Sequence, residues 1–251
     1  MNYTGVVYRP PFEANSFLLQ VTKGCSHNKC SFCYMYPDVQ FSVCPMEEVE
    51  TISMYASIKN IKGKTDAEIR RLRDAGINEL DIGVESGLDA ALERMNKGFT
   101  SEEAQHELLR LTKAGMDYSF NAILGCGGAE LWRENAEATA RLLNRVQPHL
   151  LFIGTLHAEP GCSLYEDMKT GDFKECTYGQ LLDEQELLLT NLDLEDTYYF
   201  GSHPSNVVPM QGRLPDNKTE MIDAIRDHRK RLRRRLEEYP ARGGEGSILK
   251  R

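Results

Sequence analysis

Short apolar segments alternate with helix-forming segments along most of this 251-residue chain, and the alternation limits the folds that it can adopt. The apolar segments lie at 17–22, 51–57, 79–85, 118–125 and 150–156. They are short and only weakly alternating, which is typical of strands covered on both faces of a sheet. Strands joined by helices form βαβ units whose strands run parallel. We therefore predict an α/β fold with its functional site beyond the carboxyl ends of the strands.

Helix-forming segments fill the intervals between most of these apolar segments and continue after them. The first opens at Thr65, a favourable N-cap residue, and closes at Gly76, a favourable C-cap residue. Helices are predicted at 65–76, 100–115, 129–146, 178–192 and 218–239. The segment 197–217 is rich in Pro, Ser and Asn and is predicted to be irregular.

The charge balance and the amino terminus narrow the functional classes. The net charge of −8 argues against a broad nucleic-acid-binding surface. No apolar run approaches the roughly 18 residues of a membrane span, and "MNYTGVVYRPPFEANS" lacks the regions of a signal peptide. We therefore expect a cytoplasmic protein with reduced thiols. The basic run 229–235 is predicted to be a solvated helix face, with contact to RNA or an anionic substrate as the alternative.

Three of the seven cysteines lie within the sequence "GCSHNKCSFCYMY" at 24–36. Cys25, Cys30 and Cys33 have the spacing C-x4-C-x2-C, which in a reducing compartment indicates metal or redox chemistry. A structural zinc site uses four ligands, and His27 is an available but awkwardly placed fourth. Three thiolates alone suggest a [4Fe–4S] cluster with one open iron. The spacing by itself leaves zinc and iron–sulfur binding both open.

This loop resembles that of the radical S-adenosylmethionine (SAM) superfamily, in which the commonest spacing is C-x3-C-x2-C with an aromatic residue before the last cysteine. Phe32 occupies that aromatic position. The sequence "RPPFEANSFLLQVTKGCSHNKCSFCYMY", together with "GVESG" and "EPG" downstream, is similar to an uncharacterised subgroup with the longer C-x4-C-x2-C spacing. The resemblance extends from about residue 8 to 215. It implies a radical SAM-type partial (β/α) barrel, TIM-barrel-like, over 1–176, followed by a C-terminal helical extension at 177–251.

The resemblance also implies a reaction and its cofactors. The three cysteines of the loop would hold a [4Fe–4S] cluster, and SAM would chelate the open iron. An electron from a donor such as flavodoxin or ferredoxin would then cleave SAM into methionine and a 5′-deoxyadenosyl radical. The substrate is not identified by the sequence, although the apparent lack of cobalamin, peptide-recognition and RNA domains favours a small molecule. No catalytic residue is assigned.

Several residues at strand ends are predicted to contact SAM. Glu85 is expected to accept hydrogen bonds from the ribose hydroxyls, with Ser86 as a weaker partner, and a capping or loop carboxylate is the alternative. Gly125 permits close approach of the backbone to a flat ligand, with a plain tight turn as the alternative. Leu156 and His157 are expected near adenine through backbone groups, although His157 is equally typical of a packed histidine.

We expect one βα unit to be missing from the chain. The interval between Cys33 and Thr51 lacks the glycine-rich segment that holds the amino group of SAM in the family, and it is short for a parallel crossover. Either a helix–strand–helix segment is absent between Glu50 and Thr51, which we favour, or the barrel is short. A degenerate scaffold binding iron–sulfur or zinc without catalysis is therefore the alternative function, and an RNA-binding module is a third.

Two further sets of residues are assigned more loosely. The segment "GSHPSN" at 201–206 is predicted either to fold over the barrel mouth toward the substrate or to form a surface loop with Asx and Ser turns. The remaining cysteines have irregular spacing, so we expect buried inert thiols rather than an auxiliary cluster. They are Cys44, Cys126, Cys162 and Cys176.

Overall fold

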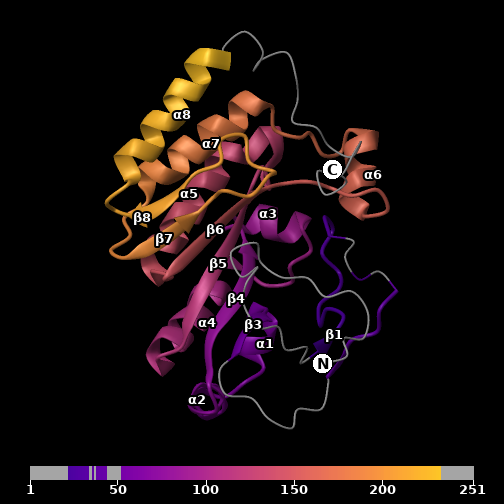
Figure 1. Cartoon of the computed structure of the whole chain (residues 1–251). Helices are drawn as coiled ribbons and strands as arrows, with labels where there is room; N and C mark the ends of the chain where they lie inside the picture. The colour runs from indigo at the N-terminus through magenta and orange to yellow at the C-terminus, as the bar shows by residue number, and fades with distance from the viewer. Residues whose placement is uncertain (1–21, 34–35, 37, 44–51, 233–251) are drawn as a thin grey trace.

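A six-stranded sheet organises the computed structural model, which describes residues 22–33, 36, 38–43 and 52–232 (Figure 1). The strands lie in chain order, and the first five are parallel while the last is antiparallel. They are β3 (Ile52–Ala56), β4 (Ile77–Glu85), β5 (Asp117–Leu124), β6 (Leu150–Thr155), β7 (Thr197–Phe200) and β8 (Gln211–Leu214). The predicted α/β fold on a parallel sheet is confirmed.

Eight helices accompany the sheet in the described part of the chain. They are α1 (Ile58–Lys62), α2 (Asp66–Asp74), α3 (Asp89–Arg94), α4 (Ser101–Ala114), α5 (Gly128–Val146), α6 (Ser163–Thr170), α7 (Tyr178–Asn191) and α8 (Lys218–Leu232). Thr65, Thr100 and Thr177 each form a capping box, which fixes where α2, α4 and α7 begin. The predicted helices are confirmed, except that residues 233–239 of the last one lie outside the described residues. The sequence did not predict α1, α3 and α6, because five to eight residues are too few to show a helical period.

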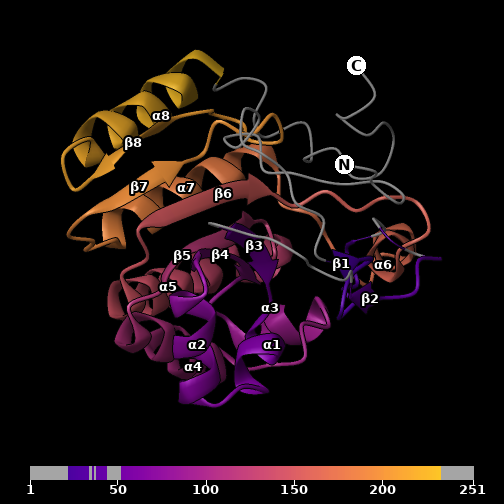
Figure 2. The ribbon, with the colours of Figure 1, turned by 60° about the horizontal axis from the view of Figure 1, so that its bottom comes forward.

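Six of the described helices, α1, α2, α4, α5, α7 and α8, form one layer against one face of the sheet. In β4, Leu80, Ile82 and Val84 alternate toward this layer and are buried. They share a core with Leu108 of α4 and Leu143 of α5, and the layer continues through α7 to α8. Figures 1 and 2 show α5, α7 and α8 lying side by side along the sheet. This packing buries the apolar stripe of each helix and supplies most of the folding free energy.

The opposite face of the sheet, called here the inner face, is polar near β4 and β5 and aromatic near β6 and β7. The alternation that buries Ile82 and Phe120 directs the neighbouring residues to the inner face. Gly83, Asn121, Phe152 and Phe200 are paired across β4 to β7, in this order, and form one row on this face. The rings of Phe152 and Phe200 stack at the β6–β7 end of this row, with centroids 5.6 Å apart.

The segment 197–217 was predicted to be irregular, and this prediction is wrong in part. The segment contains the strands β7 and β8. Both strands are four residues long, and β8 (QGRL) lacks the apolar alternation from which a strand is predicted. They extend the sheet beyond β6, so the residues after 176 share one sheet and one core with those before. The division at 176 and 177 stays a prediction.

The amino-terminal predictions are only partly covered by the described residues. The predicted strand at 17–22 lies outside them except for Thr22, which belongs to β1 (Thr22–Lys23). This strand pairs antiparallel with β2 (Ser42–Val43), away from the main sheet. The proposed gap between Glu50 and Thr51 also lies outside the described residues. In the part that the structure describes, no helix is long and apolar enough to span a membrane.

Gly87 permits a close approach between the loop after β4 and helix α5. A Cβ atom at Gly87 would collide with the backbone of Ala138 and Thr139, and the Gly87 amide donates to Thr139 Oγ1 at 2.9 Å. We expect Gly87→Ala to lower the free energy of unfolding by about 2 kcal/mol, because the helix backbone cannot yield. Urea unfolding followed by circular dichroism measures this loss.

Gly63→Ala is the matched control. A Cβ atom there would meet only Lys59 and Asn60 carbonyl oxygens, at 3.5 and 3.7 Å. Its effect should stay within about 0.5 kcal/mol. Equal stability of the two variants would contradict the close approach at Gly87.

Candidate functional site

The predicted site residues follow the carboxyl ends of three neighbouring strands. Glu85 ends β4, Gly125 follows β5, and Leu156 follows β6. Because these strands are parallel, their ends lie at one edge of the sheet. Figure 2 shows β1, β2 and α6 grouped beyond this edge. The cysteine loop between β1 and β2 therefore meets the strand ends, as predicted.

Backbone and side-chain hydrogen bonds seat the cysteine loop on the turn after α3. The Ser31 amide donates to Met95 O at 3.0 Å, and the Ser31 hydroxyl donates to Arg94 O at 2.7 Å. In the reverse direction, Asn96 Nδ2 donates to Lys29 O at 2.7 Å. These bonds satisfy polar groups on both sides and fix the position of the loop.

Helix α6 holds the other side of the same loop. The Leu164 amide donates to Ser31 O at 2.9 Å. Phe32 packs on a small apolar cluster that includes Leu156, Cys126 and Leu164. The predicted residues Phe32 and Leu156 therefore belong to one cluster, although they are far apart in the sequence.

Both ring nitrogens of His27 are used within the protein. Nε2 donates to Asn96 O at 2.7 Å, and Nδ1 accepts from Lys59 Nζ at 3.3 Å. A zinc ion would have to displace one of these bonds to gain His27 as its fourth ligand. The geometry therefore favours a set of three thiols over a Cys₃His zinc site.

The three thiols belong to one loop but do not form a closed metal site within the described residues. Cys25 and Cys30 are partly buried and Cys33 is exposed, and the Asn28 amide donates to Cys25 Sγ at 3.4 Å. Among the described residues, no group of three or more His, Cys, Asp or Glu side chains is arranged to hold a metal ion. Burial raises the pKa of Cys30 to about 11, so metal binding there must displace a proton.

Lys97 is a buried cation between the cysteine loop and β4. Its Nζ atom lies 3.2 Å from Glu85 Oε1 and 3.9 Å from Cys30 Sγ. The rings of Phe32 and Phe99 lie about the same ammonium, with centroids 6.0 and 5.9 Å away. Burial opposes the charged form, but the nearby Glu85 carboxylate, with a smaller contribution from Cys30, outweighs it and raises the pKa of Lys97. The charged pair thus connects the loop to the sheet.

The backbone of Glu85 is unusual and directs its side chain inward. Its φ angle is 75°, a left-handed conformation uncommon for residues other than glycine, and the register of β4 with β5 shifts between Gly83 and Glu85. The carboxylate folds back over Gly83, where a Cβ atom would lie 2.5 Å from Glu85 Oε1. Gly83 therefore leaves room for the Glu85–Lys97 pair on the inner face. Such strained residues often occur at functional sites.

A buried hydrogen-bond network ties the β4 and β5 ends together. Ser86 is fully buried, and its hydroxyl donates to Asn135 Oδ1. Asn135 Nδ2 donates to Glu184 Oε1 at 2.6 Å, and the Gly125 amide donates to Glu184 Oε2 at 2.8 Å. Ser86 thus supports the edge from behind, and its direct contact with a cofactor stays a prediction.

His157 has an unsatisfied buried atom at this edge. Its Nε2 atom is buried and makes no hydrogen bond, although Glu159 Oε1 lies 3.4 Å away. Just before it, the Leu156 amide donates to Leu124 O at 2.8 Å, which extends the β5–β6 pairing and fixes this segment. The atom thus has a neighbouring carboxylate but no aligned hydrogen bond, and a bound ligand could supply one.

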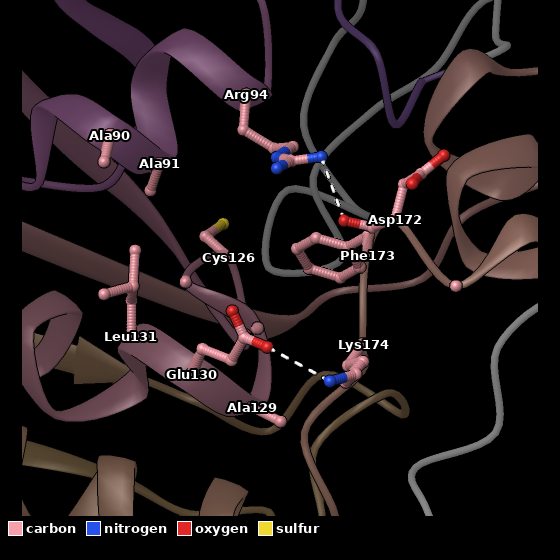
Figure 3. Close-up of a pocket in the computed structure, with 13 residues that line it drawn as sticks. Ala90, Ala91, Arg94, Cys126, Ala129, Glu130, Leu131, Asp172, Phe173 and Lys174 are labelled. Atoms are coloured by element: carbon pink, nitrogen blue, oxygen red, sulfur yellow. Dashed lines mark hydrogen bonds and ion pairs between the residues drawn. The ribbon is translucent and has the colours of Figure 1, made fainter.

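A cavity of about 130 Å³ lies between α3, the start of α5 and the segment 171–174 (Figure 3). Arg94, Cys126, Phe173 and Lys174 line it, and Arg94 reaches across to donate to Asp172 O at 3.3 Å. This volume is smaller than the roughly 300 Å³ at which pockets for cofactor-sized ligands begin. SAM therefore does not fit within this cavity.

The remaining predicted groups are structural in the described residues. Cys126, Cys162 and Cys176 are buried, as expected of inert thiols, and Cys44 lies outside the described residues. On α8, Arg226 and Arg229 pair with acidic side chains of α7. Of these two, Arg229 belongs to the basic run 229–235, and its ion pairs neutralise part of the run; a solvated helix face for the run stays a prediction.

Sequence reasoning missed Lys97 and Glu184. Lys97 follows Glu85 by twelve positions, on a short turn, and no local pattern distinguishes it from a surface lysine. Glu184 lies in an amphipathic helix where an acidic residue is ordinarily exposed. The signal in the sequence would have been a lysine downstream of the strand-end glutamate. Such a pair has no characteristic spacing, so the sequence does not identify it.

The fold is similar to those of solved proteins, while no protein-family model and no curated protein sequence matches the chain. Against Elp3 of the archaeon Methanocaldococcus infernus, with residues 1–46 deleted, the TM-score is 0.52 at 14% identity, over 77% of this chain and 43% of Elp3. The chain therefore spans less than half of that relative. This likeness confirms the predicted fold class, a partial α/β barrel built on a mainly parallel sheet.

Two other structures align with lower TM-scores. TsrM from Kitasatospora setae, a radical SAM methyltransferase with cobalamin and a [4Fe–4S] cluster bound, gives 0.39 at 14% identity over 47% of this chain and 23% of TsrM. Methylornithine synthase (PylB) gives 0.38 at 13% identity over 76% of this chain and 59% of PylB.

Glu184 should make stability fall as pH rises. Burial raises the pKa of Glu184 from 4.5 to about 7, so the native state keeps a proton that the unfolded state has lost. The stabilisation from the protonated carboxyl is fully present below 4.5, the pKa in the unfolded state, and is lost as pH rises through 7. The free energy of unfolding falls by about 3 kcal/mol over this range. Urea unfolding at pH 5 and pH 8 should show this difference in the native protein but not in Glu184→Gln.

A second variant tests the cause of the shift. Asn135 donates to the ionised carboxylate, so Asn135→Ala should move the loss of stability to higher pH. Parallel stability–pH profiles for all three proteins would contradict a protonated Glu184.

Proposed function

We propose that this chain is a radical SAM enzyme that binds a [4Fe–4S] cluster through Cys25, Cys30 and Cys33 and acts on a small-molecule substrate. The observation that carries the proposal is the seated cysteine loop. Its backbone is fixed on the turn after α3, His27 is committed to Asn96 and Lys59, and three thiols remain.

The residues present fit an iron–sulfur cluster by the chemistry of their donor atoms. Three thiols within nine residues match a cluster held at three corners, and Lys97 supplies a positive charge 3.9 Å from Cys30. The thiols must still gather around iron, because they do not form a closed site on their own. Amides such as that of Asn28 are available to donate to the sulfur atoms.

The chain's own groups would bind SAM and orient it. When bound, the cluster supplies the electron that splits SAM into methionine and a 5′-deoxyadenosyl radical. Glu85 faces inward and can accept hydrogen bonds from the ribose hydroxyls, while Lys97 holds its carboxylate in place. The unsatisfied Nε2 atom of His157 supports a polar contact with adenine beside Leu156. Gly125 is held in position by Glu184.

Exposure of the loop suits an external reductant. Cys33 is the exposed member of the trio, so the cluster would lie near the surface on that side. We propose a small electron-transfer protein such as flavodoxin or ferredoxin as the donor, and the cytoplasm as the location, where such donors and reduced thiols occur.

Each of the three cysteines should be required for iron. Cys25→Ala, Cys30→Ala and Cys33→Ala should each lose the cluster, because a cluster with two protein ligands is poorly held. Anaerobic reconstitution should give about four irons per native chain. Dithionite with SAM should then release 5′-deoxyadenosine from the native protein only.

Cys176→Ala is the control, since this thiol is buried in the main core and should leave the iron content unchanged. A colourless native protein with tightly bound zinc would overturn the proposal in favour of a non-catalytic metal-binding scaffold.

Gly83→Ala should weaken SAM binding without removing any polar group. The added Cβ atom would lie 2.5 Å from Glu85 Oε1 and push the carboxylate out of position. We expect the Kd for SAM to rise about tenfold, which is 1.4 kcal/mol, while the iron content is unchanged. Calorimetric titration of the unreduced, reconstituted protein measures this change.

Gly154→Ala is the matched control on the same face, because its Cβ atom would meet only Ser205 Oγ and Phe152 at 3.8 and 3.9 Å. Glu85→Gln should resemble Gly83→Ala. Loss of iron in either variant, or unchanged SAM affinity in both, would show that Glu85 does not bind the ribose.

A further inference from the structure

The segment 201–206 lies at the carboxyl ends of β6 and β7, on the same edge as the cysteine loop. Asn206 is buried, and its Nδ2 atom donates to Ile153 O and Gly201 O, both at 2.8 Å. Ser205 Oγ accepts from the Thr155 amide at 2.9 Å, and Thr155 Oγ1 donates to Asn206 Oδ1. The segment is therefore fixed to the end of β6 by side-chain bonds. Bonds within the segment also form turns, so a place over the barrel mouth stays a prediction beside the surface loop.

Hydrogen bonds define the tautomer of His203 within this segment. The Ser205 amide donates to His203 Nδ1 at 3.2 Å, and the Ser205 hydroxyl lies 2.7 Å from the same atom. A backbone amide can only donate, so Nδ1 is the unprotonated nitrogen. The proton of the neutral ring is therefore on Nε2. Burial lowers the pKa of His203, which favours this neutral form.

The ring of His203 lies on the inner face of the sheet. It contacts the ring of Phe152 edge to face, with centroids 5.7 Å apart. Phe152 belongs to the row that starts at Gly83, beneath the Glu85–Lys97 pair, and passes through Asn121. Two strand spacings, about 10 Å, separate Gly83 from Phe152 along this row. The structure gives His203 Nε2 no hydrogen-bond partner among the described residues.

We propose that His203 is a specificity-determining residue that donates a hydrogen bond from Nε2 to a carbonyl or carboxylate oxygen of the substrate. The apolar part of the substrate lies against Phe152, and the reacting carbon lies toward Asn121 and Glu85. Ser205 is a positioning residue, because it fixes the tautomer of His203 and attaches the ring to the end of β6. This inference rests on the proposed function for the identity of the reaction, but not for the donor itself.

Nitrogen-15 NMR of the reconstituted full chain, labelled at histidine, tests the donor directly. Two-bond nitrogen–proton correlations should show His203 neutral with its proton on Nε2 at pH 7.5. The probes are benzoate and benzamide, which present an oxygen acceptor on an aromatic ring, and benzylammonium, which presents only donors. Benzoate and benzamide should shift the Nε2 resonance, and benzylammonium should not.

Two substitutions separate the donor from the shape of the side chain. His203→Ala should weaken benzamide binding about tenfold, and His203→Gln should restore it to within about threefold, because the glutamine amide places an N–H group near the position of Nε2. His106→Ala is the control, on an exposed face of α4. The proposal is overturned by a proton on Nδ1, by equal binding to His203→Ala, or by an equal response to benzylammonium. Iron content and 5′-deoxyadenosine release are measured separately, so failure of the proposed function is recognised on its own.

Discussion

The buried ion pair between Lys97 and Glu85 is the interaction on which the candidate site depends. It joins the cysteine loop, the turn after α3 and the end of β4 at one point. Removing one partner would leave the other charged and buried, at a cost of roughly 3–5 kcal/mol. The left-handed backbone at Glu85 and the missing side chain at Gly83 are both needed for this pair to form. The strained backbone of Glu85 is thus tolerated because it directs the carboxylate inward, toward Lys97.

Other groups, on the helix side of the sheet, stabilise the edge around this pair without contacting the pair itself. Glu184 of α7 holds Gly125 and, through Asn135, Ser86. Helix α6 holds the cysteine loop through Ser31. The strand ends, the described part of the loop and the helix layer are therefore connected by hydrogen bonds. Such support is what a site needs if it is to bind a cofactor in one orientation.

The alternation of apolar and helical segments was enough to predict the parallel sheet, because each element is long and its period is clear. The same reasoning failed for β7 and β8, where four residues show no period and the pairing comes from the neighbouring strand. The position of Cys30 and Glu85 at one edge followed from topology. Their connection through Lys97 did not, since a contact twelve residues away depends on how the turn after α3 folds.

The bond from Glu184 to Gly125 has a consequence for protein engineering. A helix from the last third of the chain fixes a turn in its middle, so the sheet edge is not a module that can be cut out before α7. A shortened or recombined version that stops at the end of β6 would keep every cysteine of the loop and yet lose the support of its neighbouring turn. Any transplanted or minimised scaffold must therefore carry the chain through Asn191.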